Sequence, residues 1–359
     1  MARIVRCCKW YSNAQTIFTA NIANESISSL SRLFSVPIDS IIKYNPNSEI
    51  QLKIGQKLSI KDAIIHFGGG CTAELVSKQG LLLTNHHCGY DAIAELSSAE
   101  KNYLKNGYWA KNRADELKPS SLFVRFFVRM DDVSKRILSK VNPSMSEADR
   151  EKAINAEIAA IEKENNEGGK YTVSVRSFFQ GNEYYYFVYQ DYKDVRLVGT
   201  PPESIGKFGG DTDNWEWPRH TGDFSVFRVY MNKEGKPAQY SADNIPFKPK
   251  YYLPVSIKGF KDGDYSMIYG YPGGTNRYET SFGVKLATDI TSPTLVKLRD
   301  MRLKFMFAEM KKSAAVKLQL ASNYASIANY WKFFDGETKQ LLKFDTYGQK
   351  QKVEASFND

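Results

Sequence analysis

Residues 68–88 read GGGCTAELVSKQGLLLTNHHC. Two short apolar runs, at 71–76 and 81–85, lie on either side of a glycine, and this pattern predicts a β-hairpin. Cys71 begins the first run and Cys88 follows the second, so the hairpin would bring their sulfur atoms within bridging distance. We therefore expect a Cys71–Cys88 disulfide, which would close a loop of about 17 residues, stabilise the fold by roughly 3 kcal/mol and indicate an oxidising compartment.

Two adjacent histidines, His86 and His87, lie at the end of this hairpin. Histidine suits the role of general base near neutral pH, because its ordinary pKa is about 6.5. On a strand, successive side chains point to opposite faces, so we expect only one of the two to face a site. His87 is the better candidate, because the His-Cys order that it forms with Cys88 is similar to that of chymotrypsin-like barrels. The disulfide would also hold its backbone in place.

A histidine base needs a carboxylate that selects its tautomer and stabilises the imidazolium form. Asp211 and Asp213 begin like a calcium loop, but the residues that follow lack the ligand and the glycine that such a loop requires. Asp223 directly precedes an alternating apolar strand at 224–230. Chymotrypsin-like barrels present their orienting acid in a similar way, so we expect Asp223 to be the partner of His87.

The rest of the chain divides into a strand-rich part and a helical part. Between residues 61 and 280, short β-branched and aromatic runs are separated by Gly, Pro and Asp, which is typical of a sandwich or barrel. Ser146 is the expected cap of one helix, which would end at Gly168. From residue 281 to 359, apolar residues recur at helical intervals and predict a helical region. Further strands are expected at 122–128, 171–179, 184–189, 224–230, 251–257 and 266–270.

The first 60 residues carry two separate patterns. Residues 1–23 begin with basic residues but lack the apolar run that a secretory signal requires. Residues 24–60 contain FSVPIDSIIKYNP and LKIGQKLSI, which resemble the second helix and the closing strand of a LysM module, a small βααβ unit. That resemblance implies binding of N-acetylglucosamine-containing glycans such as peptidoglycan. The alternative is a helix–strand cap that packs on the next domain.

Four longer motifs resemble the bacterial dipeptidyl-peptidase 7 and 11 family. They read IKDAIIHFGGGCTAE from residue 60, LLTNHHCGY from 82, GKFGGDTDNWEWPRHTGDFSVFR from 206 and YPGGTNRY from 271. The similarity covers residues 60–359 and implies a serine exopeptidase that removes dipeptides from the free N-terminus of peptides. It further implies a mostly β fold with α, a chymotrypsin-like double β-barrel with an inserted α-helical domain. The family acts in the periplasm or at the cell surface, often as a homodimer, and needs no metal or other cofactor.

The resemblance also assigns roles to individual residues. It implies that His87 is the base and Asp223 its orienting acid. Asn214 and Trp215 would hold the amine and the backbone of the substrate, and Asn329 in the helical region would clamp the same amine. These roles suit an exopeptidase, because an –NH3+ group is bound through hydrogen-bond acceptors such as amide oxygens.

The nucleophile of such an enzyme is a serine in a Gly-x-Ser-Gly turn whose amides form the oxyanion hole. The 359 residues contain no such segment. In the family it follows the helical domain, so we expect residues 61–280 to be the N-terminal part of the peptidase domain and 281–359 the start of an incomplete helical domain. On this interpretation the chain is truncated, needs a C-terminal half that carries the serine, and is inactive alone.

Several other classes of protein are disfavoured. The net charge is +9, but Lys and Arg are scattered among Asp and Glu, which argues against a nucleic-acid partner. No apolar run approaches the roughly 20 residues of a membrane span. A zinc hydrolase built on His86, His87 and His220 would lack the usual ligand spacing. The main alternative function is glycan binding by the LysM-like module, with a vestigial peptidase half.

Overall fold

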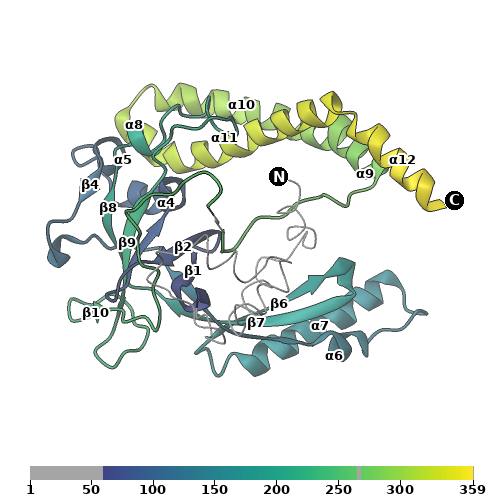
Figure 1. Ribbon diagram of the computed structural model, residues 1–359, viewed down its shortest axis with the longest axis horizontal. Coiled ribbons are helices and arrows are strands. Elements are labelled where there is room, and N and C mark those ends of the chain that lie inside the picture. Colours follow the sequence, from purple (N-terminus) through teal and green to yellow (C-terminus); the bar gives the residue numbers. More distant parts are fainter. Residues whose placement is uncertain (1–59, 265–267, 359) are drawn as a thin grey trace. The chain divides into compact units, whose positions relative to one another are not determined.

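The computed structural model describes residues 60–264 and 268–358 (Figure 1). The N-terminal segment 1–23 and the LysM-like module, apart from Ile60, therefore lie outside the described residues. The chain forms two compact units, each assembled from three separated segments. Their described residues are 60–84, 122–196, 227–264 and 268–275 in the first unit, and 85–121, 197–226 and 276–358 in the second.

The first unit is built on an antiparallel sheet that contains the predicted hairpin. Strands β2 and β3 pair with Glu74 opposite Leu83. The hydrogen-bonded order is β8-β9-β3-β2-β1-β5-β7-β6, and β10 pairs with β9. The strands, of which β8 and β9 continue into the second unit, are β1 (Ile64–Phe67), β2 (Cys71–Leu75), β3 (Leu81–Thr84), β5 (Val124–Asp132), β6 (Thr172–Phe178), β7 (Glu183–Tyr192), β8 (Val195–Thr200), β9 (Ser225–Met231) and β10 (Ile245–Pro246).

Two clusters of buried side chains hold this unit together. One is mainly aromatic and includes Phe127 and Phe187 from the paired strands β5 and β7. The other packs two helices against β6 and β7 through Ile137 and Ile161, both fully buried (Figure 1). Burial of each such side chain stabilises the fold by roughly 1.5–3 kcal/mol. The helical elements of this unit are α6 (Ser134–Leu138), α7 (Glu147–Asn165) and the 3-10 turns Ile60–Ala63 and Phe179–Gly181.

Most of the elements expected in this unit are confirmed. Helix α7 begins at the expected cap, because the Ser146 side chain accepts a hydrogen bond from the backbone of Asp149. The strand expected at 251–257 is wrong. Leu253 N–H donates to Leu75 O (2.8 Å), but Pro254 has no N–H with which to continue a ladder. Residues 268–270 of the strand expected at 266–270 are also non-regular, and 266–267 lie outside the described residues.

The second unit is mainly helical, as expected for the region after residue 281. The long helices α10 and α11 lie alongside each other and bury Leu303, Ile327 and Ala328 between them (Figure 1). Strand β4 pairs with the second half of β8, with Tyr108 opposite Thr200. The elements are α4 (His86–Leu96), α5 (Tyr103–Asn106), β4 (Tyr108–Trp109), a 3-10 turn (Arg113–Asp115), α8 (Glu203–Gly206), α9 (Ser281–Leu286), a π-helical turn (Ala287–Thr291), α10 (Ser292–Met310), α11 (Ala314–Lys343) and α12 (Thr346–Asn358).

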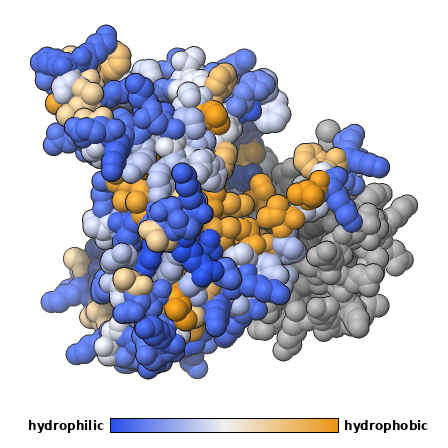
Figure 2. Space-filling model, turned by 90° about the vertical axis from the view of Figure 1, so that its left-hand side faces the viewer, coloured by the Kyte–Doolittle hydropathy of each residue, from blue (hydrophilic) through white to orange (hydrophobic). Residues whose placement is uncertain are grey.

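On the face shown in Figure 2, most of the described side chains are hydrophilic. Hydrophilic side chains surround a patch of hydrophobic ones on the face shown in Figure 2. Large apolar side chains that lie exposed on helices of the second unit include Phe282, Phe305 and Phe357. None of the described helices combines the length and the apolar character that a membrane crossing would need.

Candidate active site

His87 and Asp223 form a hydrogen-bonded pair within the second unit. The His87 ring nitrogen Nδ1 lies 2.7 Å from Oδ2 of Asp223. The backbone N–H of His87 donates to the other carboxylate oxygen, Oδ1, at 3.0 Å. The His87 side chain is 67% exposed, whereas that of Asp223 is 17% exposed. The carboxylate is thus held from two sides behind an imidazole that is open to solvent.

Asn85 fastens the carboxylate further. This residue precedes helix α4, and its side-chain amide donates to Asp223 Oδ2 (3.3 Å) and to the Asp223 carbonyl (3.2 Å). Its own carbonyl accepts a hydrogen bond from Ser225 Oγ at 2.9 Å. Asn85 therefore links the start of α4 to the residues that begin β9. These hydrogen bonds hold the imidazole and the carboxylate in a fixed position relative to each other.

The charge state of Asp223 follows from this environment. Burial disfavours the ionised carboxyl, but the hydrogen bonds and the positive charge that His87 offers outweigh burial, so the pKa of Asp223 lies below its ordinary value. The carboxyl group is therefore ionised at neutral pH. An ionised carboxylate at Nδ1 selects the tautomer in which Nε2 can accept a proton, and it stabilises the imidazolium that results.

The expectation that strand alternation separates the two histidines is wrong. Both lie in the first turn of helix α4, where successive side chains are about 100° apart. His86 is 1% exposed and packs against Gly206, where an added Cβ would lie 2.4 Å from the imidazole ring. Burial lowers the pKa of His86, which keeps it neutral. His87 is still the histidine that can act as a base, because it is the exposed one.

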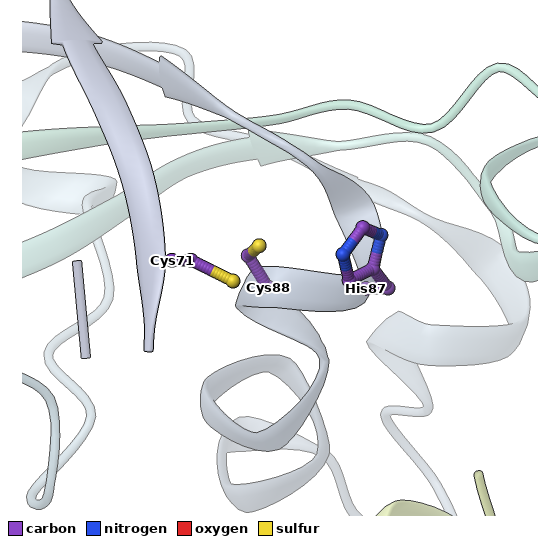
Figure 3. A group of neighbouring side chains, drawn as sticks. All are labelled: Cys71, His87 and Cys88. Atoms are coloured by element: carbon purple, nitrogen blue, oxygen red, sulfur yellow. The ribbon is translucent and has the colours of Figure 1, made fainter. Parts of the chain in front are cut away.

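The disulfide between Cys71 and Cys88 is confirmed. Cys88 directly follows His87 in the first turn of α4, as Figure 3 shows. A covalent link at this position restrains the backbone that carries the imidazole. Because the sulfur atoms are bonded to each other, neither is the thiolate that a metal site would use.

Asn214, Trp215 and Asn329 come together in the same unit. Asn214 Nδ2 donates to Oδ1 of Asn329 at 2.7 Å, and Trp215 Nε1 donates to the Asn329 carbonyl at 3.1 Å. Asn329 belongs to helix α11, whereas the other two lie in the non-regular segment between α8 and β9. Asn329 thus forms one polar cluster with Asn214 and Trp215, which lie 115 and 114 residues earlier in the chain. Their role in substrate binding stays a prediction.

Two positively charged residues of this cluster, Arg219 and Lys332, were not expected from the sequence. Arg219 Nη1 donates to Oδ1 of Asn214 at 3.0 Å. Lys332 of helix α11 donates to the backbone carbonyl of Thr212. A signal for Lys332 was present, because a residue three positions after Asn329 shares its face of the helix. Arg219 had no comparable signal, since it lies in a segment without periodicity.

A partly buried carboxylate that orients an accessible imidazole is the arrangement with which hydrolases activate a hydroxyl nucleophile. The Peptidase S46 family profile matches residues 45–359, and the chain belongs to this peptidase family. It is 60% identical over 299 residues to dipeptidyl-peptidase 7 of Capnocytophaga gingivalis, which covers 83% of this chain and 42% of that protein. It is 48% identical over 301 residues to an Asp/Glu-specific dipeptidyl-peptidase of the same organism, which covers 84% of this chain and 42% of that protein.

A solved structure resembles the fold over most of the chain. The crystal structure of Porphyromonas endodontalis DPP11 in complex with the dipeptide Arg-Asp superposes with a TM-score of 0.77 at 37% identity. The match covers 92% of this chain and 48% of that one. This chain therefore spans between two fifths and one half of the length of these relatives.

Proposed function

We propose that this chain supplies the general base and the substrate-amine site of a serine dipeptidyl-peptidase, which releases dipeptides from the free N-terminus of peptides. The observation that carries the proposal is the His87–Asp223 pair, 2.7 Å apart, in the same unit as the Asn214–Asn329 cluster. The names of the relatives support it, since both are dipeptidyl-peptidases. The complex of DPP11 with a dipeptide supports it as well.

In the proposed mechanism, Nε2 of His87 takes the proton from a serine hydroxyl while the seryl oxygen attacks the scissile carbonyl carbon. Asp223 stabilises the imidazolium that forms. His87 then gives the proton to the leaving amine as the C–N bond breaks, and water hydrolyses the acyl-enzyme in the same way. We place the serine and its oxyanion-hole amides outside these 359 residues, on the second barrel of a chymotrypsin-like double β-barrel.

The amine site would set the exopeptidase specificity. A protonated N-terminus has three donors and no acceptor, so it binds where oxygen acceptors converge. The side-chain oxygens of Asn214 and Asn329 each retain a second lone pair beyond the hydrogen bond that they already accept. A peptide with a blocked N-terminus would lose the charge-assisted hydrogen bonds made there.

The surroundings of the enzyme are a separate part of the proposal. The Cys71–Cys88 disulfide supports an oxidising compartment, the periplasm or the cell surface, because disulfides persist there and are rare in the cytosol. A homodimer is proposed from the family resemblance. The LysM-like sequence at 24–60 supports peptidoglycan as a second ligand, which a pull-down on purified peptidoglycan with an Ile41→Ala, Tyr44→Ala variant would test.

The activity is tested on fluorogenic dipeptide substrates by comparing the 359-residue chain alone with a full-length product, in which a serine-bearing C-terminal half follows the chain. We expect the full-length product to release dipeptides, and to do so equally well in the presence of a chelator. The isolated chain should be inactive, because we place the nucleophilic serine outside it. An N-acetylated substrate should not be cleaved. Cleavage of the blocked substrate at the rate of the free one would contradict the proposal, and so would dipeptide release by the isolated chain.

A further inference from the structure

Lys332 of helix α11 contacts the segment between α8 and β9 at two points. The Lys332 ammonium donates to the carbonyl of Thr212 and lies 3.3 Å from Oε1 of Glu216. Its side chain is only 20% exposed. Thr212 and Glu216 flank Asn214 and Trp215 on either side. One cation therefore holds both ends of the short stretch that carries the two polar groups.

Lys332 lies on the face of α11 that also carries Asn329, three residues earlier. The ring centroid of the next residue, Phe333, lies 5.5 Å from that of Trp215. Together with the two hydrogen bonds of Asn329, these contacts tie the segment to a single stretch of helix. The segment itself has no helix or strand to stabilise it.

The backbone of this stretch needs such support. Trp215 has a φ of +65°, in the left-handed region that a bulky side chain rarely adopts. A conformation of this kind persists only where neighbouring contacts determine it. For Trp215 these contacts come from α11, because its indole bonds to Asn329 and its ring packs on Phe333.

We propose that Lys332 is a positioning residue for the peptide-amine site. It holds residues 212–216 on α11 in the conformation in which Asn214 and Trp215 meet Asn329. Lys332 does not bind the substrate itself, because its ammonium is committed to Thr212 and Glu216. The pairing with Glu216 also offsets a positive charge that would otherwise repel a substrate amine. This inference rests on the proposed function.

The kinetic test uses the full-length product with Lys332→Met, and Lys339→Met as the matched control. Lys339 lies on the same helix, but it is 69% exposed and pairs with Asp335 of that helix at 2.6 Å. We expect Lys332→Met to raise KM roughly ten- to a hundredfold, with kcat changed by about twofold or less. Lys332→Arg should restore most of the affinity, because a guanidinium can donate to both partners.

A second measurement is independent of activity. The Trp215 indole N–H signal, assigned in the 359-residue chain with a Trp215→Phe variant, reports the hydrogen bond to Asn329 directly. Lys332→Met should shift or broaden this signal, while Lys339→Met should leave it in place. Thermal unfolding of each variant shows whether it is folded, and Glu216→Gln tests the same fastening if Lys332→Met does not fold.

The outcomes separate this inference from the proposed function. If the full-length product is inactive but the indole signal responds to Lys332→Met, the proposed function is wrong. The inference that Lys332 holds residues 212–216 on α11 is then still supported. If the product is active but neither KM nor the indole signal responds, Lys332 has no positioning role. Equal responses of the Lys332 and Lys339 variants would likewise overturn the inference.

Discussion

The His87–Asp223 pair and the Asn214–Asn329 cluster lie in the same unit, but different interactions hold them in place. His87 and Asp223 are joined by a backbone N–H as well as by a ring nitrogen, at the beginnings of a helix and a strand. Asn214 lies in a non-regular segment that side chains of α11 hold in place. The first site is therefore set by secondary structure, and the second by packing between distant parts of the chain.

The largest expected effect breaks the first site alone. His87→Ala removes the base, so kcat of the full-length product should fall by about a million-fold, as for the histidine of a comparable triad. His220→Ala is the matched control, because His220 is an exposed histidine outside both sites. Steady-state kinetics on a dipeptide substrate measures both. A His87 variant that keeps a tenth of the activity would show that this pair is not the catalytic one.

A smaller effect sharpens the same comparison. Asp223→Asn keeps the shape of the side chain but removes the charge that stabilises an imidazolium, and kcat should fall by about ten thousand-fold. KM should change little, since Asp223 lies in the first site and not in the amine cluster. A change confined to KM would contradict this role, because Asp223 would then act in substrate binding and not in catalysis.

A measurement of unfolding free energy tests how closely the His86 ring packs against Gly206 of α8. Gly206→Ala would place a Cβ 2.4 Å from the His86 ring, so the free energy of unfolding should fall by about 1–3 kcal/mol. Gly336→Ala is the control, because nothing lies within 4 Å of its added Cβ and alanine favours a helix interior by roughly 0.5–1 kcal/mol. Denaturant unfolding compares the two. If Gly206→Ala proves neutral, α8 can move relative to α4.

The smallest expected effect is a dependence of stability on pH. The pKa of Asp223 is lower in the folded chain than its ordinary value. The carboxylate therefore contributes stability above the unfolded pKa of about 3.9, and that contribution is lost as the pH falls through the lower folded value. Asp223→Asn should flatten the stability curve below about pH 4. The same slope in both proteins would contradict this assignment.

Local pattern predicted the frame of the first site and nothing of the second. The β2–β3 hairpin and the disulfide follow from glycines, cysteines and strand alternation close to each residue. His87 and Asp223 lie 136 residues apart, and their pairing was expected from their similarity to the histidine and the acid of chymotrypsin-like barrels. Helix α4 was missed, although Asn85 is a favourable cap and Tyr90 and Ile93 are spaced as on a helix face. The Asn214–Asn329 contact spans 115 residues, and no local spacing encodes it. A resemblance to known proteins was needed to name those residues.

The interleaving of the two units has a consequence for how the protein is made. Each unit draws on three stretches of chain, so a single proteolytic cut or a gene boundary cannot separate one from the other as an intact piece. Ser322 of α11 hydrogen-bonds to Asp91 of α4. During translation, about 230 further residues must be synthesised after α4 before this contact can form. Such distant closures are slow, and a chain that has not yet completed them exposes apolar surface that favours aggregation.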